Sequence, residues 1–228
     1  TAFEERYLMI CKAIKERYPQ VTVCGTVGPF HEPSADYIEG WTFAKKHHQY
    51  IDWVDEHYYE SPGWFLHHQD YYDNYDRKGP KVYIGEYAGN SKNKVWNALA
   101  EGIHLCNVER NGDIVAMASY APLLCHQKHQ NWNPDLIYFD QDTLKTTPNY
   151  EMQKFFSTHS GDRYVTSTLK AEKAIAYRIG TSVVKDTKTG KTYLKVVNAL
   201  PRTLRLKVEG TSLGVVTVPK YSYQVFEL

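Results

Sequence analysis

The stretch Lys81-Val-Tyr-Ile-Gly-Glu-Tyr-Ala-Gly-Asn90 decides the fold of this chain. It opens with β-branched and aromatic residues directly after Gly79-Pro80, so the pattern predicts a strand over residues 81–87. Glu86 lies at the carboxyl end of that strand, which is where parallel α/β folds bind ligands and do chemistry. A carboxylate there is costly to bury unless it is paired or has a task. Glu86 is therefore either a catalytic group or one half of a salt bridge across a barrel mouth.

Helices and further strands alternate on both sides of this stretch. Strands are expected over residues 21–27, 51–59 and 114–121, and helices over residues 3–18, 34–48, about 65–75 and 91–107. Successive strands begin roughly 30 residues apart, which is the length of one unit of a (β/α)-barrel. A complete barrel needs roughly 250 residues. The pattern therefore predicts an α/β fold in which residues 1–148 form half of a (β/α)8 TIM barrel.

From about Tyr150 the apolar pattern changes to a period of two. Leu204, Leu206 and Val208 alternate with polar residues, and further strands are expected over 193–197, 215–218 and 221–226, with a turn at Thr189-Gly190. This alternation predicts an antiparallel β-sandwich domain over residues 149–228. Between the two domains, residues 123–147 are expected to form a long polar connection, and loops of that length are often functional.

Composition narrows the class of protein. The 228 residues carry a formal net charge of +1 and 42% hydrophobic residues, which is ordinary for a globular protein. That charge balance provides no basic surface for nucleic acid or an anionic membrane. No apolar run approaches the roughly 20 residues of a membrane span. The first residues do not resemble a signal peptide, and the missing initiator Met indicates a processed or cut N-terminus.

Four cysteines and many aromatic residues are the other compositional features. The cysteines show no C-x-x-C spacing, which predicts free and mostly buried thiols. The compartment stays open, with an extracellular or periplasmic location favoured over a cytoplasmic one. Aromatic residues make up 14% of the chain, including 19 Tyr and 5 Trp. Such rings suit stacking against sugars, although most of them are expected to fill the core.

Three strand ends should meet at one mouth of the barrel, namely those at residues 55–59, 85–87 and 119–122. A carboxylate, a His and several Tyr around one cavity suit glycoside hydrolysis. Retaining glycosidases use two carboxyl groups about 5–5.5 Å apart. Glu86 can serve as the nucleophile if a Tyr or His keeps it ionised. Glu56 alternates away from His57 along its strand and is expected to be structural.

Four motifs together resemble one known family. They are Val-Asp-Glu-His-Tyr-Tyr at 54–59, Tyr-Ile-Gly-Glu-Tyr-Ala at 83–88, Glu-Arg-Asn-Gly-Asp-Ile-Val-Ala-Met-Ala-Ser-Tyr-Ala-Pro-Leu at 109–123, and Asn-Trp-Asn-Pro-Asp-Leu-Ile-Tyr-Phe-Asp at 131–140. The chain is similar to family 51 glycoside hydrolases, which are α-L-arabinofuranosidases. The resemblance implies the C-terminal half of a retaining (β/α)8 barrel followed by a jelly-roll β-sandwich.

The resemblance also implies roles for individual residues. Glu86 corresponds to the nucleophile, and the substrate-binding residues would be His57, Tyr58, Tyr59 and Trp132. Many family members have a Gln after that Trp, whereas this chain continues Asn-Pro-Asp. The family's acid/base Glu ends the fourth strand in an Asn-Glu pair, and it is expected upstream of this chain. The fragment alone is therefore expected to be inactive.

The implied partners are an arabinofuranosyl-containing polysaccharide or oligosaccharide and the missing N-terminal half of the same polypeptide. Two alternatives stay open: another retaining barrel glycosidase, or a non-catalytic fragment that binds carbohydrate or self-associates as a homo-oligomer through open strand edges. No cofactor is predicted, because glycine-rich phosphate loops and esterase Ser motifs are absent. No metal is predicted either, because the spacing of Cys125-His126-x-x-His129 does not enforce converging ligands.

Overall fold

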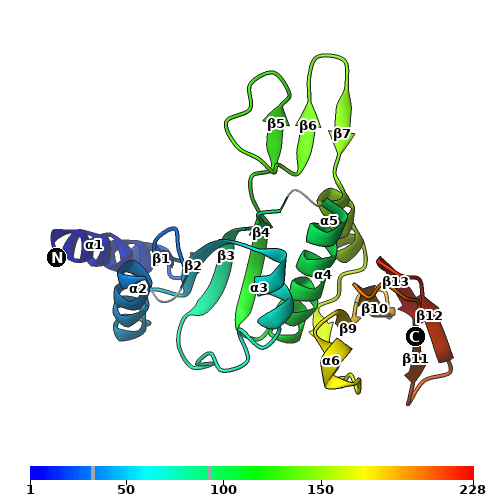
Figure 1. Ribbon diagram of the computed structural model, residues 1–228. Helices are drawn as coiled ribbons and strands as arrows, with labels where there is room; N and C mark the ends of the chain where they lie inside the picture. Colours follow the sequence, from blue (N-terminus) through cyan, green and yellow to red (C-terminus); the bar gives the residue numbers. More distant parts are fainter. Residues whose placement is uncertain (32–33, 92–93) are drawn as a thin grey trace. The chain divides into compact units, whose positions relative to one another are not determined.

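The computed structural model describes residues 1–31, 34–91 and 94–228 (Figure 1). The chain divides into two compact units, which are described separately below. Unit 1 comprises residues 1–59, 75–87 and 113–120, and unit 2 comprises residues 60–74, 88–112 and 121–228. The expected domain boundary after residue 148 falls inside unit 2, at the start of a helix, and it stays a prediction.

Unit 1 is built on a four-stranded sheet with the order β1-β2-β3-β4. Its strands are β1 (Cys24–Thr26), β2 (Trp53–Glu60), β3 (Lys81–Gly89) and β4 (Val115–Tyr120), and its helices are α1 (Ala2–Arg17) and α2 (Ala35–Lys46). The β1–β2 and β3–β4 pairs are parallel, and the spatial order follows the chain order (Figure 1). The four strands and the first two helices thus confirm the predicted alternation of strands and helices, with ends shifted by a few residues.

Local sequence signals explain the helix starts in unit 1. The Thr1 side chain accepts a hydrogen bond from the Glu4 N–H and Glu4 reaches back, which forms a capping box for α1. Ser34 caps α2 by accepting from the Tyr37 N–H. The apolar side chains of α1 are only partly covered, because Cys11 is buried while Phe3 is 61% exposed.

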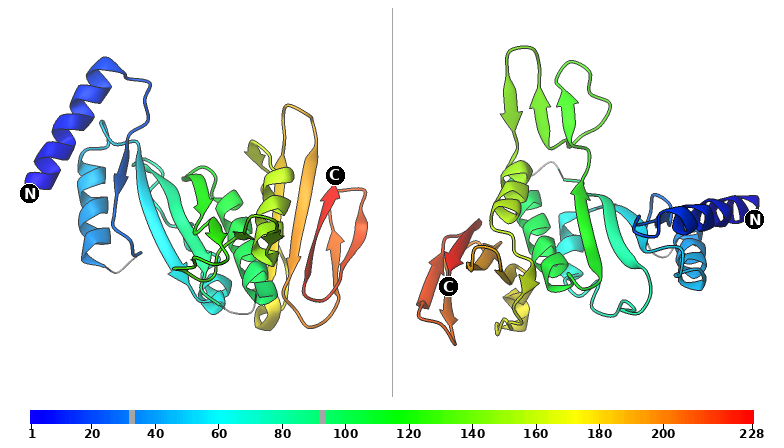
Figure 2. Two further views of the ribbon diagram at one scale, coloured as in Figure 1. Left: turned by 90° about the horizontal axis from the view of Figure 1, so that it is seen from above. Right: turned by 180° about the vertical axis from the view of Figure 1, so that it is seen from behind.

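The described residues of unit 2 form four helices and the remaining strands. The helices are α3 (Pro62–His67), α4 (Lys94–Arg110), α5 (Pro148–Thr158) and α6 (Lys173–Ala176). The strands are β5 (Leu124–His126), β6 (Ile137–Phe139), β7 (Leu144–Thr146), β8 (Arg163–Tyr164), β9 (Ile179–Lys185), β10 (Thr192–Asn198), β11 (Leu204–Val208), β12 (Gly214–Val218) and β13 (Ser222–Glu227). They form three sheets, with the orders β13-β10-β9-β8, β11-β12 and β5-β6-β7 (Figure 2).

Two antiparallel sheets share the apolar core of unit 2. Its buried members come from both sheets and the turn after β10: Ile179, Val183, Leu194, Val196, Leu200, Leu204 and Val218. The hairpin between β9 and β10 turns at Gly190, whose φ of +77° favours glycine. The structure therefore confirms an α/β part followed by an antiparallel sandwich-like part, with the predicted strands at 193–197, 204–208, 215–218 and 221–226 all present.

The prediction of a long loop over residues 123–147 is wrong, because this segment forms the sheet of β5, β6 and β7. The first two strands pair in parallel and the last two antiparallel. Each strand has only three residues, so none is long enough to show a periodic pattern. Tertiary pairing, rather than local propensity, specifies this sheet.

Two helices also differ from the prediction. The helix expected over residues 65–75 ends at His67, and the Tyr-rich segment after it forms turns. The change to period two was placed at about Tyr150, but α5 occupies that region, with Thr147 as its cap and Pro148 in its first turn. The predicted start of the helix at 91–107 lies partly outside the described residues, and α4 is described from Lys94.

The carboxyl of Glu101 joins α4 to the end of β3 inside unit 2. Its Oε1 accepts a 2.8 Å hydrogen bond from the Gly89 N–H, and the residue is fully buried. Burial raises the pKa of the Glu101 carboxyl to about 7, although the bond from the Gly89 N–H opposes this shift. Glu101 therefore folds most favourably as the neutral acid.

This burial predicts a pH-dependent stability. The carboxyl has an ordinary pKa of 4.5 when exposed, so between pH 4.5 and about 7 the folded state keeps a proton that the unfolded state has lost. Raising the pH through that window should cost about 3 kcal/mol of unfolding free energy. A Glu101→Gln variant should lose this pH dependence, as measured by urea unfolding at about pH 4.5 and pH 8. Parallel pH profiles for both proteins would contradict the assignment.

Candidate functional site

Strand β2 separates polar and apolar side chains onto two faces of the sheet in unit 1. Asp55, His57 and Tyr59 are half-buried and share one face, whereas Val54, Glu56 and Tyr58 are buried on the other. This follows from the two-residue repeat of a strand. The carboxyl end of β2 therefore presents an acid, an imidazole and a phenol together.

Glu86 lies next to this face, on the neighbouring strand β3. The Tyr59 hydroxyl donates a 2.5 Å hydrogen bond to Glu86 Oε2, within the range of charge-assisted O–H···O⁻ bonds. Burial, and next the bond to Glu86, raises the pKa of Tyr59, so the phenol stays protonated and keeps donating. Among the described residues, Glu86 Oε1 has no hydrogen-bond partner, and the Glu86 side chain is 43% exposed.

His57 lies between two carboxyl groups. Its Nε2 is 2.9 Å from Asp55 Oδ2, and its Nδ1 is 3.6 Å from Glu86 Oε2. Asp55 is three-quarters buried at its side chain, and desolvation raises its pKa while His57 lowers it. The bond to Asp55 fixes the orientation of the imidazole, so that its other nitrogen faces Glu86.

Gly85 makes this arrangement possible because it has no side chain. A Cβ on Gly85 would lie 1.9 Å from Asp55 Oδ1 and 3.0 Å from His57 Nε2. The pairing of β3 with β4 is also irregular between Ile84 and Tyr87. Such irregularities re-aim side chains at sheet ends, and here the side chain of Glu86 reaches the same face as Tyr59.

A Gly85→Ala variant should therefore be destabilised. Overpacking of this kind costs about 1–3 kcal/mol, and chemical unfolding should show it as a lower midpoint. The contact is with the Asp55 carboxylate, so adding Asp55→Ala to Gly85→Ala should recover part of the loss. An unchanged midpoint for Gly85→Ala, or no coupling in the double-mutant cycle, would contradict this packing.

The predicted structural role of Glu56 agrees with its surroundings. Its Oε1 accepts hydrogen bonds from Trp41 Nε1 at 2.9 Å and from the Tyr75 hydroxyl at 3.0 Å, and the residue is fully buried. A different contact links β3 to β4, where the Tyr83 hydroxyl and Ser119 Oγ are 3.0 Å apart. Glu56 is thus remote from Glu86 by strand alternation.

Tyr58 lies away from the predicted site. It is 1% exposed on the apolar face of β2, where it packs near His31 and Tyr87. The alternation that brings His57 and Tyr59 to Glu86 turns Tyr58 in the opposite direction. Tyr58 is therefore a core residue in this structure and cannot contact a ligand at Glu86.

Trp132 belongs to unit 2, on the segment between β5 and β6, and is 54% exposed. It is therefore not one of the unit 1 residues around Glu86. No group of three or more His, Cys, Asp or Glu residues in the described ranges is arranged to hold a metal ion. In the same ranges, no helix is both long and apolar enough to span a bilayer.

Sequence reasoning missed Asp55 as a member of this site. It stands in the motif at 54–59 and shares the parity of His57 and Tyr59, so alternation would have placed it on the same face. The close approach of Gly85 was also missed, because its cause is a contact between strands. The structure brings together Glu86, His57 and Tyr59 as predicted, and adds Asp55.

Two family profiles match the chain. One, described as the α-L-arabinofuranosidase C-terminal domain, matches residues 68–222, and the other, described as the α-L-arabinofuranosidase 1 domain, matches residues 1–77. Together they cover nearly the whole chain.

Named relatives carry the same description. An extracellular exo-α-L-arabinofuranosidase of Streptomyces chartreusis is 42% identical over 166 residues, which are 72% of this chain and 20% of that protein. The α-L-arabinofuranosidase 1 of Arabidopsis thaliana is 32% identical over 206 residues, or 86% of this chain and 27% of that protein. The chain thus spans less than a third of the length of these two relatives.

Solved structures show the same fold. An arabinose-bound GH51 α-L-arabinofuranosidase superposes with a TM-score of 0.74 at 24% identity, covering 99% of this chain and 40% of that one. An arabinose complex of the Thermotoga maritima α-L-arabinofuranosidase gives 0.65 at 15% identity, covering 100% of this chain and 58% of that one.

Proposed function

This chain belongs to the α-L-arabinofuranosidase family, and from that premise we propose that it supplies the nucleophile of a retaining arabinofuranosidase. The substrate class is a terminal α-L-arabinofuranosyl residue on an arabinan- or arabinoxylan-type polysaccharide or oligosaccharide. In this proposal, residues 1–148 belong to the C-terminal half of a (β/α)8 barrel, and residues 149–228 form the jelly-roll β-sandwich domain.

One observation carries the proposal: the two oxygens of the Glu86 carboxylate have different surroundings. Oε2 accepts the short bond from Tyr59, whereas Oε1 is without a partner among the described residues. In a retaining mechanism, a carboxylate oxygen attacks the anomeric carbon and forms a covalent glycosyl-enzyme. Glu86 Oε1 is the attacking atom, and Tyr59 orients the group from the other oxygen.

His57 and Asp55 position the nucleophile in this scheme. Asp55 has no oxygen available as an acid catalyst, because Oδ2 binds His57 and Oδ1 is buried over Gly85. The proton for the leaving oxygen must then come from another carboxyl group. We assign that role to a Glu from a segment upstream of this chain, which also deprotonates the water that releases the sugar in the second step.

The proposed location is outside the cytoplasm. It is supported by the description of the Streptomyces chartreusis relative as extracellular. Trp132 of unit 2 stays a proposed sugar-binding residue, and the missing half of the barrel is the proposed partner of this chain.

The test is reconstitution. The chain is expressed together with the residues encoded upstream of Thr1, and hydrolysis of an aryl α-L-arabinofuranoside is measured. Activity is expected for the pair and not for the chain alone, because the loss of general acid catalysis by itself costs about 10²–10⁴-fold. The proton NMR spectrum of the first product should show the α-anomer, since the mechanism retains configuration.

A panel of aryl pyranosides separates this proposal from the alternative of another retaining glycosidase. The proposal expects furanosides to be hydrolysed at least about 10²-fold faster, since several kcal/mol depend on the match to the ring. An inert reconstituted pair, or a preference for pyranosides, would overturn it.

A further inference from the structure

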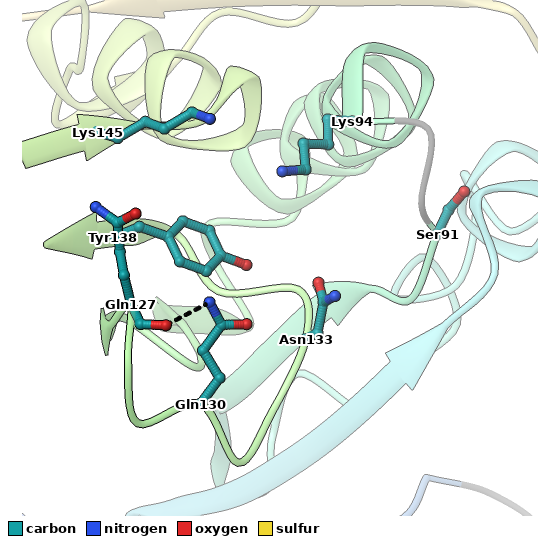
Figure 3. A pocket seen from close by; sticks show the side chains of 7 residues that line it. All are labelled: Ser91, Lys94, Gln127, Gln130, Asn133, Tyr138 and Lys145. Atoms are coloured by element: carbon teal, nitrogen blue, oxygen red, sulfur yellow. Dashed lines mark hydrogen bonds between the residues drawn. The ribbon is translucent and has the colours of Figure 1, made fainter.

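Unit 2 contains a polar hollow that the proposed reaction does not use. It has a volume of about 370 Å³ and is lined by Ser91, by the first residue of α4, by one residue each of β6 and β7, and by the segment between β5 and β6 (Figure 3). The side chains that matter here are Lys94, Lys145, Gln127, Gln130, Asn133 and Tyr138. Cavities of this size hold small ligands.

Two ammonium groups dominate the charge of the hollow. Figure 3 shows the ends of Lys94 and Lys145 pointing toward one another across it. Neither ammonium group has an ion pair or hydrogen bond among the described residues, and Lys94 Nζ lies 5.5 Å from the centre of the Tyr138 ring. None of the lining residues carries a carboxylate. Two uncompensated positive charges favour an anionic ligand.

The rest of the lining suits a sugar. Gln127, Gln130 and Asn133 are exposed primary amides, each offering a donor and an acceptor to hydroxyl groups. The Gln130 Nε2 already donates to the Gln127 backbone carbonyl at 3.3 Å, which orients that amide toward the hollow (Figure 3). Tyr138 is 8% exposed and its hydroxyl accepts from the Asp135 N–H at 3.0 Å, so it forms a fixed wall.

We propose that this hollow binds a carboxylate-bearing sugar, a uronic acid unit of an acidic oligosaccharide. The ammonium groups of Lys94 and Lys145 bind the carboxylate, and the amides of the loop between β5 and β6 bind the ring hydroxyls. A lone inorganic anion would fill only part of the space and leave the amides unused. This inference concerns residues of unit 2 only, and it is tested by binding, which does not require catalysis at Glu86.

The experiment measures binding to the full chain by isothermal titration calorimetry. The probes are an oligogalacturonide, its carboxyl-reduced neutral counterpart of equal length, and inorganic phosphate. The acidic oligosaccharide should bind at least about tenfold more tightly than the neutral one, because each charge-assisted hydrogen bond contributes that much or more. Its affinity should fall as salt is raised.

Variants locate the site. Lys94→Gln and Lys145→Gln should each weaken binding of the oligogalacturonide about tenfold, and the double variant about a hundredfold. Lys128→Gln is the matched control, because Lys128 is an exposed lysine on the same loop that does not line the hollow. It should bind like the parent chain.

Three results would overturn the proposal. The first is equal affinity for the acidic and the neutral oligosaccharide. The second is an equal loss of affinity in Lys128→Gln, which would indicate binding to diffuse surface charge. The third is an affinity for inorganic phosphate equal to the affinity for the oligogalacturonide at the same ionic strength. That result would make the hollow a general anion site.

Discussion

Replacing Glu86 with Gln is expected to lower kcat of the reconstituted enzyme on an aryl α-L-arabinofuranoside by at least about 10³-fold. The amide keeps the size of the side chain and the bond from Tyr59, but its oxygen cannot form the glycosyl-enzyme. That loss corresponds to about 4 kcal/mol of transition-state stabilisation. The measurement is kcat and KM from initial rates over a range of substrate concentrations, with KM expected to change much less than kcat.

A second variant distinguishes lost chemistry from lost structure. In Glu86→Ala, added azide should restore turnover by attacking the anomeric carbon in place of the carboxylate, and the glycosyl azide formed should have inverted configuration. Glu16→Gln, an exposed position on α1, is the neutral control. Full activity of Glu86→Gln, or the absence of azide rescue in a folded Glu86→Ala variant, would remove Glu86 from the mechanism.

Replacing Lys195 with Met should destabilise unit 2 by about 3–5 kcal/mol, because it leaves a buried carboxylate without its cation. Lys195 is fully buried, and its Nζ donates to Glu109 Oε1 at 2.5 Å and to the His159 carbonyl at 2.7 Å. Ser182 Oγ donates to the other oxygen of Glu109 at 2.5 Å. Chemical unfolding should show the loss as a lower midpoint.

Two comparisons test this explanation. Adding Glu109→Gln to Lys195→Met should recover much of the loss, since a neutral amide can still accept from Ser182. Lys207→Met is the matched control: Lys207 pairs with Glu209 at 2.9 Å, but both side chains are 74% exposed, so the midpoint should stay nearly unchanged. Equal losses in the buried and the exposed pair would contradict the role of burial.

The parts of the fold that sequence predicted are those with long periodic patterns. Strands β2 and β3 are eight and nine residues long, and the alternation in β11 continues over five residues. Patterns of this length predict the strands from the sequence. The sheet of β5, β6 and β7 has three residues per strand and no local signal. The Tyr-rich segment after His67 shows helical spacing of aromatic residues, yet tertiary packing holds it in turns.

The site was predicted to the extent that it depends on motif and alternation. Glu86, His57 and Tyr59 come together because they share a face at neighbouring strand ends. Tyr58 was included through its place in a motif, although the alternation that excluded Glu56 excludes it as well. The same alternation would have included Asp55, whereas the close approach of Gly85 to Asp55 is a contact between two strands that no single segment encodes.

Because the two faces of β2 carry different side chains, this strand should not tolerate an inserted residue, whereas the loops of the chain should. One residue added between Trp53 and Asp55 would exchange the faces, directing Glu56 and Tyr58 toward Glu86 and pushing the His57 imidazole into the core. The chain would still contain every residue of the candidate site in the same order. Homologues that have gained or lost length should therefore have done so outside this strand, and engineered libraries should treat its residue count as fixed.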